Sequence, residues 1–243
     1  MLILGVDFET AGLNTQVDNI IEVGAVLWET ERQVPLELYS SLVKVSRHVS
    51  YEITEITGIL NEDVLNYGVS PRFVFLKILT MLTDVQYIVA HNGTNFDKPI
   101  LEAELKRHEI ELPPIPWIDT MLDIPYPSRI TTRKLSYLAT EHGFLNPFAH
   151  RSLSDVLTML KVLSHYDINN VISINKEPNV TLVAEVKKPW LDVMPEGKKQ
   201  VDLAKARGYR FNGGTKQWQK IVKENSVDEE KRHGEFHVRT LET

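Results

Sequence analysis

The sequence of 243 residues contains no cysteine. This absence excludes disulfide bonds and zinc sites built from thiolates. No apolar run approaches the roughly 20 residues that a membrane-spanning helix requires, so we expect no membrane contact. The first residues lack the basic start and small-residue cleavage site of a signal peptide, and we therefore expect a cytoplasmic protein.

Basic residues are scarce in most of the chain but not at its C-terminal end. The whole sequence has a net charge of −6. Residues 1–183 carry 14 basic and 23 acidic side chains, whereas residues 184–243 carry 13 and 10. Within this second part, residues 187–223 have 10 basic and 3 acidic side chains. Such asymmetry indicates a C-terminal segment with a role of its own.

The hydrophobic pattern predicts an α/β fold. Apolar segments over residues 2–8, 19–29 and 36–43 follow one another with short polar connections, which predicts three consecutive antiparallel strands. The period then changes: helices are expected over 70–82, 95–108, 133–143 and 150–166, alternating with strands over 85–90 and 115–118. A mixed five-stranded sheet flanked by helices accounts for this order.

The C-terminal part is predicted to form a small α+β appendage. Residues 1–168 form the main domain, and residues 169–184, with Asn, Pro and few large apolar side chains, are read as a linker. Residues 185–223 form a basic module with a helix and a hairpin turn at NGG (212–214). Residues 224–243 are charged and are expected to be a flexible tail.

Two acids stand at the end of the first strand, in LILGVDFETAGL (2–13). Asp7 and Glu9 are two residues apart, so their side chains point to the same face of the strand. Like charges placed together repel, and burial adds to the unfavourable free energy. This pair therefore requires a compensating partner.

Two further segments carry acids beside the apolar core. Asp97 follows the polar loop in HNGTNFD (91–97), where taken alone it would be read as a helix cap. His150 and Asp155 in HRSLSD can converge if His150 precedes a helix that contains Asp155. Asp7, Glu9, Asp97 and Asp155 form an all-oxygen set that suits two Mg²⁺ or Mn²⁺ ions. Such a pair clamps a phosphodiester, and His150 has the right chemistry for a general base.

The three segments DFETAGL, HNGTNFD and HRSLSD resemble, in order, the three motifs of the DnaQ-like 3′→5′ exonucleases of the DEDDh subgroup. The resemblance covers residues 1–166, and a stand-alone exonuclease domain with an appended C-terminal piece resembles the exonuclease X-like and phage members. EITGI (55–59) resembles the family's helix–loop after the third strand, and WIDTM (117–121) its fourth strand–helix junction. The resemblance implies a ribonuclease H-like sheet.

The resemblance also implies roles for individual residues. Asp7 would bridge both metals, Glu9 and Asp155 would ligate the ion that activates water, and Asp97 would act through metal-bound water. His150 would be the general base on a mobile loop. Four positions would contact the substrate, namely Thr10 at the 3′-hydroxyl, Leu13 as a wedge beside the last base, Phe96 against a sugar or base, and Asn92 as a neighbour of the strand.

The basic module has two interpretations. Cations alternate with aromatic side chains here: Lys205, Arg207, Tyr209, Arg210, Phe211, Lys216 and Trp218. In one interpretation the cations bind phosphates and the aromatic rings stack on bases. In the other, which we favour, the aromatic rings form the core of the module. Lys205, Arg207, Arg210 and Lys216 remain candidate nucleic-acid contacts in both.

These observations lead to one main hypothesis and two alternatives. The main hypothesis is a metal-dependent exonuclease that hydrolyses DNA from the 3′ end, with a preference for single-stranded or frayed ends, and releases nucleoside 5′-monophosphates. It would act in a bacterial or phage-infected cell, with a polymerase or a second copy as a conceivable partner. The alternatives are an RNA-trimming enzyme on the same core and a non-catalytic nucleic-acid-binding subunit. The complete set of acids argues against the last.

Overall fold

The computed structural model describes residues 1–187 and 199–241, which form two compact units. The first unit consists of Met1–Tyr126 and Arg133–Val171, and the second of Pro127–Thr132 and the described part of Ile172–Thr243. Residues 188–198 of the predicted module and 242–243 of the predicted tail lie outside the described residues. No helix in the described ranges is both long and apolar enough to cross a membrane.

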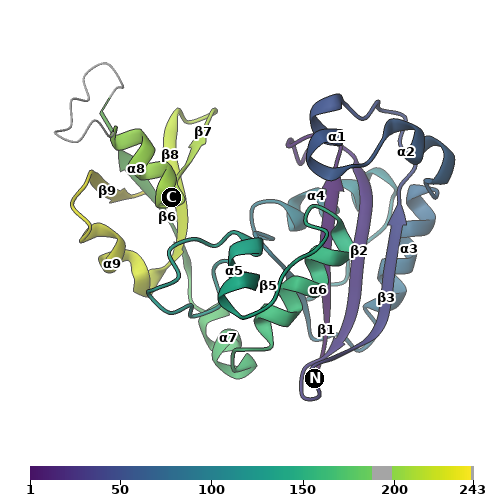
Figure 1. The fold of residues 1–243 in the computed structure, drawn as a ribbon, viewed down its shortest axis with the longest axis horizontal. Coiled ribbons are helices and arrows are strands. Elements are labelled where there is room, and N and C mark those ends of the chain that lie inside the picture. Colours follow the sequence, from purple (N-terminus) through teal and green to yellow (C-terminus); the bar gives the residue numbers. More distant parts are fainter. Residues whose placement is uncertain (188–198, 242–243) are drawn as a thin grey trace. The chain divides into compact units, whose positions relative to one another are not determined.

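The first unit is built on a five-stranded sheet in the order β3-β2-β1-β4-β5 (Figure 1). The first three strands are antiparallel neighbours, and the last two join β1 in parallel: β1 (Leu2–Thr10), β2 (Ile20–Glu29), β3 (Val34–Leu42), β4 (Tyr87–Ala90) and β5 (Trp117–Asp119). This arrangement confirms the mixed sheet that the hydrophobic pattern predicted.

The two faces of this sheet are covered by different helices, and β1 alternates between them. Leu4, Val6 and Phe8 belong to a core shared with buried side chains of α3 (Pro71–Met81) and α4 (Asp97–Arg107). The other face of β1 is covered by α6 (Ser152–Leu163), which packs against α5 (Leu135–Glu141). A Cβ at Gly5 would lie 2.8 Å from Val156 Cγ1, so α6 lies directly on β1.

Two short helices, α1 (Tyr51–Thr57) and α2 (Asn61–Tyr67), follow β3. α1 ends at Gly58, whose φ of 71° lies in the left-handed region that favours glycine. This helix and its glycine correspond to the EITGI segment that resembled a helix–loop of the family. Ile53 of α1, Val64 of α2 and Ile59 between them belong to a second apolar cluster, which includes Ala11 and Ile21 at the sheet.

The described part of the second unit contains a four-stranded antiparallel sheet in the order β7-β8-β6-β9 (Figure 1). Its elements are β6 (Asn179–Glu185), α8 (Gln200–Ala206), β7 (Arg210–Asn212), β8 (Gln217–Lys223), the short 3₁₀ turn η1 (Glu224–Ser226), α9 (Val227–Lys231) and β9 (His237–Thr240). Leu182, Ala204, Tyr209 and Phe236 pack in its core. The β7–β8 hairpin forms at the NGG turn, as predicted.

Two predictions for this region were wrong. Residues 169–184, predicted as a linker, contain most of α7 (Ile168–Asn175) and of β6. The apolar residues Val180, Leu182 and Ala184 alternate with period two, which is a strand pattern. The tail predicted over 224–243 contains α9 and β9, because Phe236 and Val238 pack in the core and β9 pairs with β6.

Candidate active site

The site begins at the carboxyl end of β1, where Asp7 and Glu9 lie on the face that α6 covers. Both side chains are partly buried. In the pairing of β1 with β2, Asp7 lies opposite Gly24 and Glu9 lies opposite Glu22. Directly opposite side chains in an antiparallel pair are neighbours. The carboxylates of Asp7, Glu9 and Glu22 therefore come together at this end of the sheet.

The start of α6 is held directly against β2. A Cβ at Gly24 would lie 2.4 Å from the backbone N of Leu153, so only glycine allows this approach. Glu22, 2% exposed, accepts hydrogen bonds from Arg151 Nη2 at 2.6 Å and from the backbone N–H of Ser152 at 2.9 Å. This ion pair fixes the N-terminal end of α6 beside Glu9.

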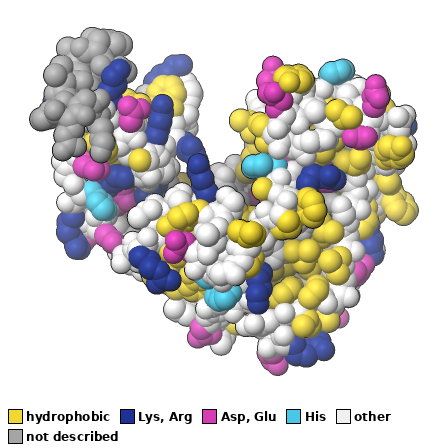
Figure 2. All heavy atoms as spheres, in the orientation of Figure 1, with side chains coloured by type: hydrophobic (Ala, Val, Ile, Leu, Met, Phe, Trp, Pro, Cys, Tyr) yellow, Lys and Arg dark blue, Asp and Glu magenta, His cyan; other side chains and the backbone are white. Residues whose placement is uncertain are grey.

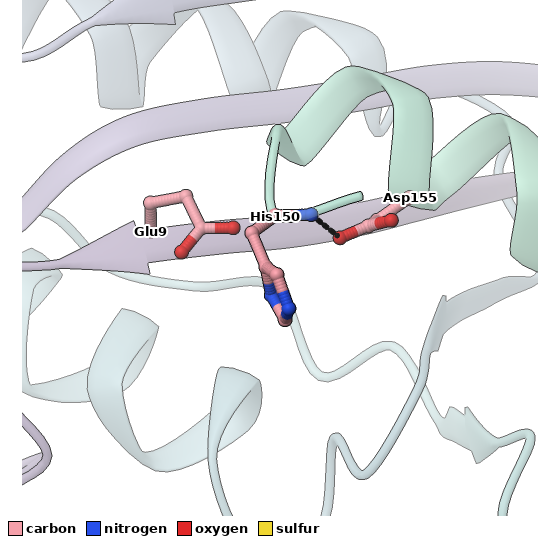
Figure 3. Close-up of side chains that lie close together, drawn as sticks. All are labelled: Glu9, His150 and Asp155. Atoms are coloured by element: carbon pink, nitrogen blue, oxygen red, sulfur yellow. Dashed lines mark hydrogen bonds between the residues drawn. The ribbon is translucent and has the colours of Figure 1, made fainter. Parts of the chain in front are cut away.

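His150 and Asp155 meet at that end, as the sequence predicted for a histidine that precedes the helix. The backbone N–H of His150 donates to Asp155 Oδ2 at 2.9 Å, and the amide of Asn146 donates to Oδ1. His150 is exposed and has a φ of 64°, in the left-handed region. Figure 3 shows Glu9, His150 and Asp155 together, and their ligand atoms lie within 4.8 Å of one another.

Asp97 is the first residue of α4 and is 2% exposed. The loop before it is shaped by Asp119 at the end of β5, which accepts the backbone N–H groups of Asn92 at 3.0 Å and Thr94 at 2.9 Å. Asp97 Oδ1 is buried and has no hydrogen-bond partner among the residues that the structure describes. Buried polar atoms in proteins almost always have a partner, so this oxygen is a candidate metal ligand.

Burial and mutual repulsion raise the pKa of all four acids. Burial raises the pKa of Asp7, and the charges of Asp97, Glu9 and Asp155 add to the effect. Burial, with Asp155 and Glu22, raises the pKa of Glu9 to about 8. Burial and, after it, the negative charge of Asp119 raise the pKa of Asp97. Burial also raises the pKa of Asp155, although bonds from Asn146 and His150 oppose it.

These carboxylates fit divalent cations. Within the described parts of the chain, no Lys or Arg side chain forms an ion pair with Asp7, Glu9, Asp97 or Asp155. The donor set is made of oxygen atoms, which Mg²⁺ and Mn²⁺ prefer, and His150 stands beside it. The unpartnered Oδ1 of Asp97 and the raised pKa values both indicate that the site lacks positive charge which bound cations would supply.

The loop that follows β1 presents Leu13, which is 84% exposed. The loop itself is anchored: Asp18 accepts the backbone N–H of Asn14 at 2.8 Å and pairs with Arg47. The carboxylate of Asp18 also lies directly against Gly12, where a Cβ would displace it. Leu13 is thus an exposed apolar side chain on an anchored loop, and its role as a wedge stays a prediction.

The other predicted substrate residues lie around the same end of the sheet. Thr10 is buried at the end of β1, and its hydroxyl donates to the carbonyl of Gly12 at 2.6 Å. Asn92 has a φ of 68°, and its side-chain oxygen accepts from Asn95. Phe96 is half-buried immediately before α4. The hydroxyl of Thr10 is thus engaged in its own turn, and the contact of Thr10 with the 3′-hydroxyl stays a prediction.

A family model described as exonuclease matches residues 4–163, which include the four acids and His150. The chain belongs to this family, the DnaQ-like exonucleases. It is 34% identical over 183 residues to the PolC-type DNA polymerase III of Thermotoga maritima, covering 75% of this chain and 13% of that protein. It is 26% identical to DNA polymerase III subunit epsilon of Treponema pallidum, covering 78% and 91%. The matched part of the chain thus corresponds to about an eighth of the length of this PolC-type relative.

Solved exonucleases share the fold. A structure of exonuclease I superposes with a TM-score of 0.62 at 15% identity, over 96% of this chain and 66% of that chain. The nuclease domain of 3′hExo, described as a DEDDh family member bound to rAMP, gives 0.56 at 17% identity over 68% and 90%. This likeness confirms the ribonuclease H-like architecture expected from the motifs.

The candidate contacts in the second unit divide into two groups. Arg207 is engaged internally: it pairs with Glu230 and lies 4.7 Å from the ring centroid of Phe236. Lys205, Arg210 and Lys216 are exposed. The structure therefore brings the five predicted catalytic residues of the exonuclease domain to one end of its sheet, and leaves three of the four predicted cations on the surface of the second unit.

Sequence reasoning missed three residues that shape the site of this exonuclease. Glu22 and Arg151 form the ion pair under α6, and Asn146 holds Asp155. A signal for Glu22 was present, since a single acid within the apolar run NIIEVGAV must be paired if the strand is buried. The partner, Arg151, depends on how α6 packs against β2, which the sequence does not specify.

Proposed function

We propose that the chain is a metal-dependent 3′→5′ exonuclease that hydrolyses phosphodiester bonds at the 3′ end of DNA, preferring single-stranded or frayed ends. Its products would be nucleoside 5′-monophosphates. The observation that carries the proposal is the cluster of Asp7, Glu9, Asp97 and Asp155, four carboxylates with raised pKa values and no cationic partner among the described residues. Membership of the exonuclease family supports it.

Asp7, Glu9, Asp97 and Asp155 would hold two Mg²⁺ or Mn²⁺ ions. When bound, such ions lower the pKa of water and stabilise the charge that develops on the leaving oxygen. The carboxylates come from β1, α4 and α6, three elements locked by the core, so the protein orients its ligands before substrate arrives.

The remaining residues act on water and on the strand. His150, exposed beside Glu9 and Asp155, accepts the proton of the attacking water as general base. Leu13 packs beside the terminal base, and the backbone around Thr10 holds the 3′-hydroxyl. Phe96 and Asn92, before α4, contact the neighbouring sugar or base. Apolar contacts of this kind do not depend on the base sequence.

DNA is the proposed substrate because the curated relatives are named as bacterial DNA polymerases. The same names support a cytoplasmic location in a bacterial or phage-infected cell and a polymerase as a partner. A second candidate, 3′-end trimming of RNA, is favoured by one observation: the superposed 3′hExo domain is described as bound to rAMP.

A substrate panel tests the proposal. Single-stranded DNA, duplex DNA and RNA of one sequence, labelled at the 5′ end, are incubated with Mg²⁺ or with excess EDTA. We expect DNA to shorten stepwise from its 3′ end and to release 5′-monophosphates, with no hydrolysis in EDTA. Faster shortening of RNA than of DNA would favour the second candidate.

Variants of the acids provide the residue-level test. We expect Asp7→Asn and Asp155→Asn each to lower kcat about 1,000-fold or more, because bound metal supplies several kcal/mol of transition-state stabilisation. Glu31→Gln is the matched control, since Glu31 is an exposed acid in the turn between β2 and β3. Undiminished activity in either site variant, or full activity in EDTA, would refute the assignment.

A further inference from the structure

The β7–β8 hairpin of the second unit carries an aromatic pair at its surface. Phe211 and Trp218 lie directly opposite each other in the strand register, with ring centroids 5.5 Å apart. Trp218 is half-buried at the margin of the core, whereas Phe211 is 51% exposed. Tyr209, two residues earlier, is fully buried. The expectation that all three rings form the core therefore holds for Tyr209 but not for Phe211.

Three cations belong to α8, to β7 and to the turn that joins β7 and β8. Lys205 Nζ, on α8, lies 5.7 Å from the ring centroid of Trp218. Arg210 is the neighbour of Phe211 in β7, and Lys216 stands in the turn with a φ of 58°. All three are exposed, and Figure 2 shows several separate Lys and Arg side chains on the surface of the second unit. Together with Phe211 and Trp218 they make up what we call the hairpin surface.

Among the described residues, the charges of the hairpin surface have no acidic partner, unlike those beside it. Lys205, Arg210 and Lys216 form no ion pair with an acid in residues 1–187 or 199–241. In contrast, Arg207 and Lys220 on neighbouring positions both pair with Glu230. Internal pairing thus accounts for part of the positive charge of this segment and leaves the hairpin surface open to an anionic ligand.

We propose that the hairpin surface binds a single-stranded segment of nucleic acid. Bases stack on exposed aromatic rings only when they are unpaired, and the three cations complement the phosphates that flank a stacked base. Lys205 lies beside the ring of Trp218, and Lys216 stands in the turn that joins β7 to β8. Arg210 precedes Phe211 in β7 and points to the other face of the strand, so the three cations lie along the hairpin on either side of the aromatic pair. The inference rests on the proposed function, in that the strand bound here is the substrate of the exonuclease.

Binding is measured on the full chain carrying Asp155→Asn, so that hydrolysis does not consume the ligand. The probe is a fluorescein-labelled oligo-dT of 20 nucleotides, followed by anisotropy at several salt concentrations. Phe211→Ala is expected to weaken binding about 5- to 30-fold with an unchanged salt slope, as for loss of one stacked base. Phe211→Tyr keeps a stacking ring and is expected to bind like the parent.

The cations are tested by the triple variant Lys205→Gln, Arg210→Gln and Lys216→Gln. Its salt slope is expected to fall by about 2, because each phosphate contact to a single strand contributes about 0.7. Phe73→Ala removes an exposed ring of α3 and is the matched control for Phe211→Ala, with no expected change in oligonucleotide affinity. Oligo-U is expected to bind within a few-fold of oligo-dT, and the corresponding duplex more weakly.

A small substrate separates this proposal from the proposed function. The p-nitrophenyl ester of thymidine 5′-monophosphate is too short to reach beyond the catalytic end, so Phe211→Ala is expected to leave its hydrolysis unchanged. Parental oligonucleotide affinity in Phe211→Ala, tighter binding of duplex than of single strand, or equal losses on oligonucleotide and ester would each overturn the hairpin surface. If the parent hydrolyses nothing while Phe211→Ala still weakens binding, the proposed function fails and the hairpin surface stands.

Discussion

Glu9 in the first unit and Glu230 in the second unit have opposite surroundings. In the first unit, burial and the charges of Asp155 and Glu22 raise the pKa of Glu9 to about 8. In the second unit, burial alone would raise the pKa of Glu230, but the hydrogen bond and charge of Lys220 and the charge of Arg207 outweigh it and lower that pKa. One acid is left unneutralised, and the other is neutralised within the chain.

This difference separates a site from a structural ion pair. A buried charge that the protein itself pairs contributes to the folded structure, and its loss leaves the partners unsatisfied. A cluster of buried acids without a cation destabilises the free protein, and it persists where an external ion or substrate compensates. Glu9 therefore belongs with function and Glu230 with folding, which yields predictions of opposite sign for the same substitution.

The largest expected effect concerns catalysis. Glu9→Gln is expected to lower kcat about 1,000-fold or more, because Glu9 is a proposed ligand of a metal pair that would supply several kcal/mol of transition-state stabilisation. Glu230→Gln is expected to leave hydrolysis of the p-nitrophenyl ester of thymidine 5′-monophosphate unchanged. Both are measured with saturating Mg²⁺ at one temperature at which both variants are folded. Equal losses in the two variants would remove the distinction between the two glutamates.

The second effect concerns stability, and here the substitution of Glu230 has the destabilising effect. Glu230→Gln is expected to lower the free energy of unfolding by about 2–3 kcal/mol, because Arg207 and Lys220 lose the acceptor that both share. Urea unfolding measures the change, with Glu31→Gln as the exposed control. A change below about 0.5 kcal/mol, which is the range of ordinary surface substitutions, would show that the pair contributes little.

Much of the exonuclease fold was predictable because its signals are local. The strand periodicity of β1 to β3 and the helical pattern over 150–166 each specify an element, and the spacing of DFETAGL, HNGTNFD and HRSLSD specifies the family. His150 and Asp155 could be placed together because five residues separate them across a helix start. The predicted convergence is confirmed in the structure, where His150 donates its backbone N–H to Asp155.

The second unit was predicted less well because its core joins distant segments. Val180 and Leu182 in β6 look like a short apolar run after a proline, and their role depends on pairing with β8 and β9, about 40 and 58 residues later in the register. Glu22 was missed for the same reason, since its partner Arg151 lies 129 residues away. Patterns within a window cannot specify contacts of this range.

The third effect is a pH dependence of the metal-free protein. Glu9 has a pKa near 4.5 when unfolded and about 8 when folded. Between these values the native state retains a proton that the unfolded chain has released, so the free energy of unfolding falls as pH rises from about 4.5 to about 8. The raised pKa values of Asp7 and Asp97 act in the same direction. Urea unfolding in EDTA at pH 5, 6, 7 and 8 measures this slope.

Glu9→Gln tests the origin of that slope. An amide cannot ionise. At pH 8 in EDTA, the free energy of unfolding of this variant is therefore expected to exceed that of the parent by about 1–2 kcal/mol, with little difference at pH 5. Saturating Mg²⁺ is expected to flatten the slope of the parent, since ions bind the deprotonated acids. A metal-free parent that gains stability from pH 5 to pH 8 would contradict the electrostatic picture of the site.

The smallest effect is expected at Arg151, which is the cation nearest the acids yet pairs with Glu22. Arg151→Lys keeps the charge but loses one of the two side-chain nitrogens that donate to Glu22, so α6 and the adjacent His150 become less firmly held. We expect kcat to fall about 3- to 10-fold, the equivalent of one hydrogen bond, with KM for the ester unchanged. Arg32→Lys, at an exposed Arg–Glu pair, is the matched control.

Calorimetric titration with Mg²⁺ distinguishes positioning from electrostatics at Arg151. None of the four acids is its hydrogen-bond partner, so Arg151→Lys is expected to keep the metal affinity of the parent within about two-fold while kcat falls. A loss of metal affinity as large as that of Glu9→Gln would place Arg151 within the acid cluster. The acid cluster would then contain a cation of its own, and Glu9 would differ from Glu230 only in how strongly a cation pairs with it.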